Sequence, residues 1–178
     1  MLFVDAAHFV YGPFLGFLWC LVRLLVPGPS GRKRYNVLAA LNAVTHEVLR
    51  VANHSSINAE SVCALLRQVA AAGLPRPLTV VLDNARYQRC ELVQSLARSL
   101  RIELLFLPGY SPNLNLIERL WKFVKKECLA GRPQPTYEAF TGAIDDCLAH
   151  LPTKYKEQMQ TLLALNFQTF EDEPVLAA

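Results

Sequence analysis

Three acidic residues, Asp5, Asp83 and Glu118, stand where the fold can bring their side chains together. Asp5 follows the apolar run 2–4 and Asp83 follows the apolar run 78–82, so each is predicted to close a buried strand. The carboxyl ends of strands form the ligand-binding edge of an open α/β sheet. Glu118 is predicted in the first turn of a helix whose start can face that edge. The sequence therefore predicts one cluster of three carboxylates.

Such a cluster indicates chemistry with divalent cations. Three converging carboxylates repel one another strongly unless hard divalent ions lie between them. This is the arrangement that two-metal phosphoryl transfer requires, with ions roughly 3.5–4 Å apart on the attacking and leaving oxygens. The pattern therefore favours an enzyme that cuts or joins phosphodiester bonds.

Each acid also has a structural explanation that stays open when it is considered alone. Asp5 can start a turn. Asp83 or Asn84 can cap the helix that follows. Glu118 lies three residues after Asn115 and can close a capping box there. Taken singly, these explanations outweigh catalysis, and only the combination of residues decides between them.

The elements that must position the acids follow from apolar periodicity and from turn residues. A mixed five-stranded sheet with helices on both faces is expected, because three early strands can form a meander and two later ones are joined through helices. The expected strands are 2–4, 35–44, 48–52, 78–82 and 102–107. The expected helices are one that begins after the N-cap Asn58 and ends at Gly73, one around 92–100, and three near 115–129, 136–149 and 154–165. An inserted excursion, 9–34, separates the first two strands.

Composition indicates one folded domain. A chain of 178 residues with 52% hydrophobic and 19% charged residues builds one core, predicted here over 1–165, followed by a flexible acidic tail, 166–178. The five scattered cysteines form no zinc-binding spacing and are predicted to be reduced core residues. The apolar run 13–26 is too short to span a bilayer and Arg23 interrupts it, so no membrane partner and a cytoplasmic, nucleoid-associated location are expected.

Three motifs together resemble the bacterial insertion-sequence branch of the Tc/mariner transposase superfamily. They are Phe3-Val4-Asp5, then Leu-Asp-Asn-Ala-Arg-Tyr at 82–87, then Pro-Gly-Tyr-Ser-Pro-Asn-Leu-Asn-Leu-Ile-Glu-Arg-Leu-Trp at 108–121. In that family three acids form the DDE site of a ribonuclease H-like fold, with 34 residues usually separating the second and third. Asp83 and Glu118 have the same separation. The resemblance runs from about residue 2 to about residue 130.

The resemblance implies a function and its cofactors. Asp5, Asp83 and Glu118 would be catalytic and bind two Mg²⁺ ions, for which Mn²⁺ can substitute, and Asn84 would support the site from beside Asp83. The family's reaction is hydrolytic nicking at transposon ends, followed by attack of the freed 3′ hydroxyl on target DNA. The implied partners are the inverted-repeat ends, the target DNA and a second copy in a homodimer.

The sequence departs from the family in two places. Leu116 stands where relatives often have proline, and the helix is expected to survive this change. Relatives also carry helix-turn-helix domains before the first catalytic strand, whereas four residues precede Asp5 here. Two explanations stay open: a separately encoded helix-turn-helix portion, or a truncated remnant. The excursion also contains a group of apolar residues: Phe14, Phe17, Leu18 and Trp19. They can make assembly contacts or pack in the domain's own core, and the two interpretations are equally good.

Basic residues provide candidate DNA contacts. The predicted set combines the run Arg32-Lys33-Arg34 with four residues of the Glu118 helix: Arg119, Lys122, Lys125 and Lys126. The alternative for the helix is an ordinary solvated face. Two alternative functions also stay open: a ribonuclease H-like nuclease, and a catalytically silent transposase remnant that binds DNA or assists assembly.

Overall fold

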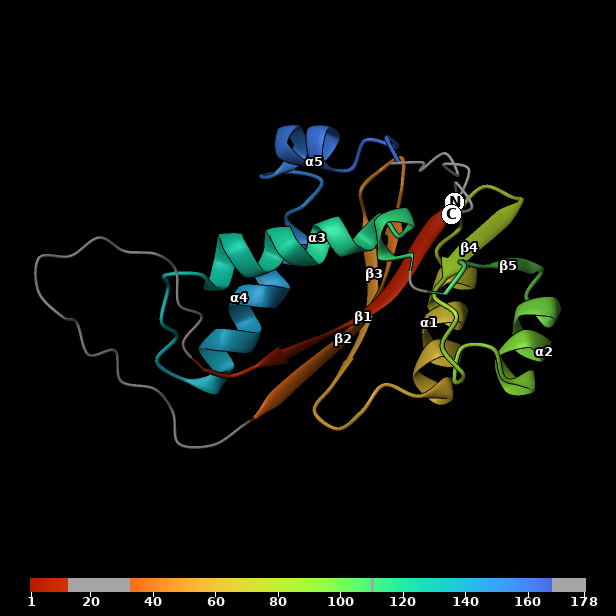
Figure 1. Cartoon of the computed structure of the whole chain (residues 1–178), viewed down its shortest axis with the longest axis horizontal. Coiled ribbons are helices and arrows are strands. Elements are labelled where there is room, and N and C mark those ends of the chain that lie inside the picture. The colour runs from red at the N-terminus through yellow and green to blue at the C-terminus, as the bar shows by residue number, and fades with distance from the viewer. Residues whose placement is uncertain (13–32, 110, 168–178) are drawn as a thin grey trace, which may run out of the picture.

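A five-stranded mixed sheet forms the centre of the molecule in this computed structural model, which describes residues 1–12, 33–109 and 111–167 (Figure 1). The strand order is β3-β2-β1-β4-β5. The pairs β1–β2 and β2–β3 are antiparallel, whereas β4 is parallel to both β1 and β5. The strands are β1 (Leu2–Val10), β2 (Arg34–Asn42), β3 (Val48–Asn53), β4 (Leu78–Leu82) and β5 (Ile102–Phe106). The predicted mixed sheet is therefore confirmed.

Two helices cover one face of the sheet. They are α1 (Ala59–Ala71) and α2 (Glu91–Ser99), and they pack against alternate residues of the central strands such as Leu2 and Val4. The helix α1 begins as predicted at Asn58, whose side chain accepts a hydrogen bond from the Ser61 amide while the Ser61 hydroxyl accepts one from the Asn58 amide. Residues of β2 are buried on both faces because a second layer lies opposite.

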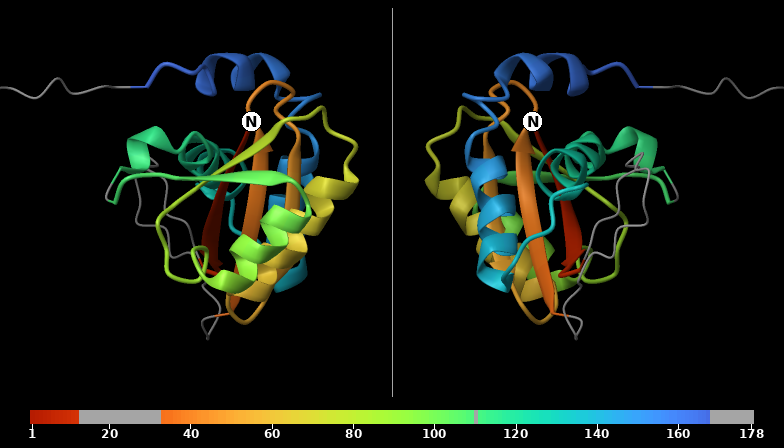
Figure 2. Two further views of the ribbon diagram at one scale, coloured as in Figure 1. Left: turned by 90° about the vertical axis from the view of Figure 1, so that its right-hand side faces the viewer. Right: turned by 90° about the vertical axis from the view of Figure 1, so that its left-hand side faces the viewer.

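The second layer contains the helix that carries Glu118. It consists of α3 (Ile117–Val124), a wide π-helical turn η2 (Lys125–Leu129), α4 (Tyr137–Ala149) and α5 (Lys156–Leu162). These elements pack against Phe3, Ala7 and Phe9, the residues of β1 that point away from α1. Figure 2 shows α5 at the end of the sheet where β2 turns into β3. The prediction of helices on both faces is confirmed, and no helix within the described residues is long and apolar enough to cross a membrane.

The strand that carries Asp5 is longer than predicted. It continues through Asp5 to Val10, because apolar and small residues follow and β2 pairs with it throughout, including Asp5 with Ala39. The prediction that Asp5 closes its strand was therefore wrong. Pairing with β4 nevertheless ends at Val4 and Leu82, so β1 and β4 separate at Asp5. The predicted excursion shortens accordingly, and its residues 13–32, including the apolar group proposed for assembly, lie outside the described residues.

Two of the structural explanations for the acids are also wrong. The helix α2 begins at Glu91, eight positions after Asp83, so neither Asp83 nor Asn84 caps it. Glu118 closes no capping box with Asn115, because α3 has no side-chain cap and the Asn115 side chain is directed elsewhere. The combined span of α3 and η2 ends at Leu129, as predicted for this helix.

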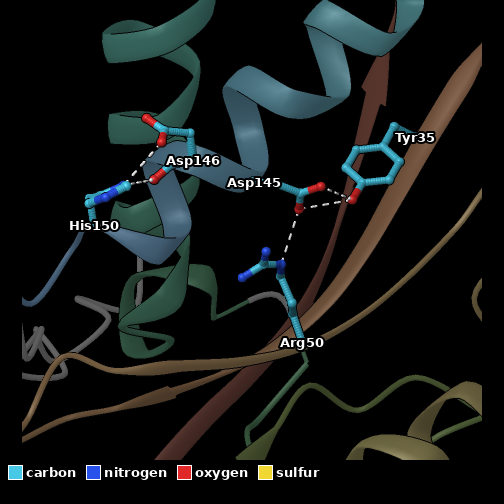
Figure 3. Close-up of polar contacts among 5 residues, drawn as sticks. All are labelled: Tyr35, Arg50, Asp145, Asp146 and His150. Atoms are coloured by element: carbon cyan, nitrogen blue, oxygen red, sulfur yellow. Dashed lines mark hydrogen bonds and ion pairs between the residues drawn. The ribbon is translucent and has the colours of Figure 1, made fainter.

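A polar network attaches α4 to the sheet (Figure 3). The Tyr35 hydroxyl lies 2.9 Å from both carboxylate oxygens of Asp145, and Arg50 Nε donates to the same carboxylate at 3.0 Å. Burial, followed by the hydrogen bond to Asp145, raises the pKa of Tyr35. The neighbouring Asp146 instead pairs with His150 on the exposed side of the helix.

The end of the described chain is held by Arg119. Its guanidinium donates hydrogen bonds to the carbonyls of Leu162, Ala164 and Asn166 at 2.7–3.3 Å. The ring of Phe167 then lies 6.1 Å from that of Phe3. Two residues of the predicted flexible tail, 166 and 167, thus make contacts, and 168–178 lie outside the described residues.

Candidate active site

The structure brings Asp5, Asp83 and Glu118 together. One carboxylate oxygen from each lies within 4.8 Å of the others. Asp5 belongs to β1, Asp83 directly follows β4, and Glu118 lies in the first turn of α3. The three acids therefore converge where β1 and β4 separate, although they are far apart in sequence.

Buried residues at the start of α3 fix the direction of Glu118. After β5 the chain passes Pro108-Gly109 and a short 3₁₀ turn η1 (Pro112–Leu114) before α3 begins. Leu116, Ile117 and Leu120 are fully buried beneath the helix. The leucine at the position where relatives often have proline therefore provides packing, and the helix forms as expected.

Asn115 contacts the acid cluster through its side chain, a role that the sequence did not reveal. Its Nδ2 donates to Asp83 Oδ1 at 2.9 Å and to the carbonyl of Val4 at 3.3 Å. The residue is only 1% exposed, and its Oδ1 accepts no hydrogen bond from the described residues. The amide nitrogen is thus directed at Asp83 and at β1.

Trp121 is a second residue that sequence reasoning did not assign to the site. Its indole Nε1 donates to Asp5 Oδ2 at 3.0 Å, and its ring meets Phe9 edge-on. The signal was present in the spacing, because Trp121 follows Glu118 by three positions and so shares a face of the helix with it.

The environment of Asp5 opposes ionisation. Burial, foremost, and the negative charges of Glu118 and Asp83 raise the pKa of Asp5 to about 7. Hydrogen bonds from the Ala6 main chain and from Trp121 act in the opposite direction. Nearby Tyr87 experiences the same field, since burial and then the charges of Asp5 and Asp83 raise its pKa. A strongly perturbed carboxyl within a cluster of acids is typical of a functional site.

The proposed supporting residue Asn84 lies beside Asp83 but is exposed. Its Oδ1 accepts a hydrogen bond from Arg89 Nη1 at 2.7 Å, and Arg89 lies over the ring of Phe106. Support of the site by Asn84 stays a prediction, and the contact made to Asp83 by an amide comes from Asn115.

The predicted DNA-binding residues are in different situations. Lys122, Lys125 and Lys126 are exposed on α3 and η2, and Lys33 and Arg34 are exposed at the start of β2. Arg32 lies outside the described residues. The guanidinium of Arg119 is engaged by three carbonyls of the chain end, so in this structure it stabilises the fold.

The donor set of the cluster fits a hard divalent cation. It consists of carboxylate oxygens, the ligands that Mg²⁺ and Mn²⁺ prefer, without a cysteine or histidine among them. A bound cation would also offset the repulsion that raises the pKa of Asp5. The cysteines among the described residues are not involved: Cys63, Cys128 and Cys147 are buried without a disulfide, as predicted, and Cys90 is half-buried.

Comparison with known proteins agrees with the geometry. The profile of a family described as "DDE superfamily endonuclease" matches residues 22–141, a range that includes Asp83 and Glu118. A curated relative is the "Insertion element IS630 uncharacterized 39 kDa protein" of Shigella sonnei, 28% identical over 123 residues, which cover 66% of this chain and 35% of the relative.

Solved structures with the same fold include a "Mos1 transposase paired-end complex with left transposon end" and a "Mos1 mariner paired end complex with Mn". The first has a TM-score of 0.64 and 16% identity, covering 94% of this chain and 56% of the other. The second has a TM-score of 0.62 and 16% identity, covering 96% and 56%. The fold is thus ribonuclease H-like, and this chain spans little more than half the length of these proteins.

Proposed function

The chain belongs to the DDE superfamily endonuclease family, and we propose that it is the catalytic domain of a DNA transposase of the insertion-sequence type. The observation that carries the proposal is the convergence of Asp5, Asp83 and Glu118 within 4.8 Å. The proposed reaction is cleavage at transposon ends followed by strand transfer into target DNA.

Asp5, Asp83 and Glu118 are the proposed ligands of two Mg²⁺ ions, with Mn²⁺ as a substitute. When bound, such ions make an attacking water or hydroxyl nucleophilic and stabilise the leaving oxygen. The chain's own contribution is to hold three carboxylates at the edge where β1 and β4 separate. Support for the proposal comes from the all-oxygen donor set and from the Mn named with one structure of similar fold.

Exposed basic residues are the proposed contacts for DNA phosphates. On the helix they are Lys122, Lys125 and Lys126, and Lys125 Nζ lies 6.0 Å from the ring of Phe9, four positions beyond Asp5 on β1. Lys33 and Arg34 lie where β1 and β2 end their pairing, opposite Val10. Such contacts place a duplex without reading its sequence. We propose that a separately encoded helix-turn-helix portion reads the inverted repeats and that the active form is a homodimer.

A nicking assay tests the proposal. Supercoiled plasmid is incubated with the wild-type chain and Mg²⁺ or Mn²⁺, and with Asp5→Ala, Asp83→Ala and Glu118→Ala. The wild type is expected to nick DNA only with the cation, and each variant to lose this activity because one ligand is gone. A variant that retains wild-type nicking would remove its residue from the site.

A strand-transfer assay separates a transposase from a nuclease. A labelled duplex ending in a 3′ hydroxyl is offered together with target plasmid, and an RNA–DNA hybrid is offered in a parallel reaction. Joining of the duplex to the plasmid is expected. Cleavage of the hybrid without any joining would instead identify a ribonuclease H-like nuclease.

A further inference from the structure

Asn115 lies where the three elements that carry the acids meet. Its side chain donates to Asp83, which follows β4, and to the carbonyl of Val4 on β1. Its own carbonyl accepts the amide hydrogen of Glu118 at 3.1 Å. A single residue therefore contacts Asp83, the residue before Asp5, and Glu118.

The hydrogen bond to the Val4 carbonyl lies at the point where β1 and β4 stop pairing. Register pairing between these strands ends at Val4 and Leu82, so beyond this point β1 has no partner on the β4 side. The Asn115 amide provides a donor there, and the Asn115 side chain is itself buried. The separation of β1 and β4, which creates the space between Asp5 and Asp83, is thereby fixed by a side chain from the loop before α3.

Burial of this side chain is not explained by stability alone. Its Oδ1 has no partner among the described residues, and a buried unsatisfied acceptor costs roughly 1–3 kcal/mol. An apolar residue of similar size would avoid that cost but would leave Asp83 without its donor. The amide is therefore better explained by the orientation it gives to Asp83.

We propose that Asn115 is the positioning residue of the acid cluster, which sets the distance between the Asp83, Asp5 and Glu118 carboxylates and so the affinity for divalent cations. This inference rests on the proposed function. Asn115 acts by orienting ligands, since the contacts it makes are to the acids and their strands. Groups that orient metal ligands change metal affinity or activity by about 10–100-fold when they are replaced.

The test measures metal binding without DNA, through the rise in melting temperature with Mg²⁺ concentration. Asn115→Ala removes both donors. It is expected to raise the Mg²⁺ concentration that gives half of the maximal stabilisation by about 10–100-fold. Asn115→Asp keeps the shape but sets a carboxylate against Asp83, so in chelator it is expected to melt below Asn115→Ala. Asn115→Ser, a small residue that helix starts favour, is the substitute measurement if Asn115→Ala does not fold.

Asn42 offers a matched control. Its Oδ1 accepts hydrogen bonds from the amides of Val44 and Thr45 in the β2–β3 turn, away from the acids. Asn42→Ala is expected to lower the melting temperature and leave the half-saturating Mg²⁺ concentration unchanged. Asn42→Asp retains the acceptor and is expected to behave like the wild type.

Equal half-saturating Mg²⁺ concentrations in the wild type and Asn115→Ala, or in the wild type and Asn115→Ser, would overturn the proposal and leave Asn115 a structural residue. Failure of this proposal can be distinguished from failure of the proposed function. A wild-type chain that is stabilised by Mg²⁺ but nicks no DNA would contradict the transposase activity, while the comparison of the Asn115 variants would still decide their role. A wild-type chain that Mg²⁺ does not stabilise would contradict both.

Discussion

Replacing Asp5 with asparagine is expected to make the metal-free protein more stable at neutral and alkaline pH. The substitution removes a charge that burial and two neighbouring carboxylates oppose, and it keeps the side-chain shape. The asparagine oxygen can still accept the hydrogen bond that Trp121 donates to Asp5. The change therefore isolates the cost of ionising Asp5 in the folded protein.

The magnitude follows from the pKa of Asp5, which rises from 3.8 to about 7 on folding. A difference of about three units corresponds to roughly 4 kcal/mol of destabilisation once the group is ionised in both states. Asp5 is partly exposed, so solvent screening reduces this to about 2 kcal/mol. For a chain of this length, that is a rise in melting temperature of roughly 4–8 °C.

The sign of the pH dependence is also fixed. Because the folded-state pKa is the higher one, the free energy of unfolding of the wild type falls by this amount as the pH rises from about 4 to about 7. The advantage of Asp5→Asn should therefore be absent at pH 4 and complete above pH 7. Thermal melts in chelator across this range measure it. With saturating Mg²⁺ the order should reverse, because the wild type keeps its full ligand set.

One pattern of melts would refute the reasoning. If Asp5→Asn in chelator is no more stable than the wild type at pH 8, neither burial nor the neighbouring carboxylates oppose ionisation of Asp5 in the folded protein. An advantage that is equal at pH 4 and pH 8 would refute it too, since ionisation of Asp5 would then play no part.

Three other predictions concern the surroundings of the site. Trp121→Phe removes a donor that favours the ionised form of Asp5, so the acidic limit of nicking should move to higher pH by roughly one unit or less; an unchanged pH profile of the initial rate would contradict this. Asp145→Ala should lower the free energy of unfolding in urea by about 1–3 kcal/mol because Tyr35 loses its partner, whereas exposed Asp146→Ala should change it by less than about 1 kcal/mol; equal losses would count against the network. Lys122→Gln combined with Lys125→Gln should reduce the salt dependence of DNA affinity by about two in log–log slope, measured by fluorescence anisotropy, whereas the same change at exposed Arg67 of α1 and exposed Lys156 of α5 should not; equal slopes would make the lysines an ordinary solvated face.

The sequence predicted the acids and the sheet because their signals are local. The run 78–82 is apolar throughout and ends in Asp83, and Asn58 has the side chain that starts a helix, so both elements form where expected. The segment 108–115 before Glu118 is rich in proline, glycine, serine and asparagine, residues that favour turns over helix. These features do not depend on distant parts of the chain.

What the sequence did not reveal depends on partners that are remote along the chain. Asp5 was expected at the end of a strand, but β2 pairs with β1 well beyond it. Asn115 was interpreted as a capping residue, yet its partners are 32 and 111 positions away. Arg119 was assigned to DNA, and its guanidinium is engaged by residues more than 40 positions later. Such contacts exist only once β1, β4 and α3 have been brought together.

The most direct test of the central claim is a crystal of this chain grown or soaked with Mn²⁺ and measured for anomalous scattering. If Asp5, Asp83 and Glu118 form a metal site, anomalous peaks should lie between their carboxylate oxygens, which are within 4.8 Å of one another, and should be lost in Asp83→Ala. Mn²⁺ peaks elsewhere on the molecule, with none between these three carboxylates, would contradict the account.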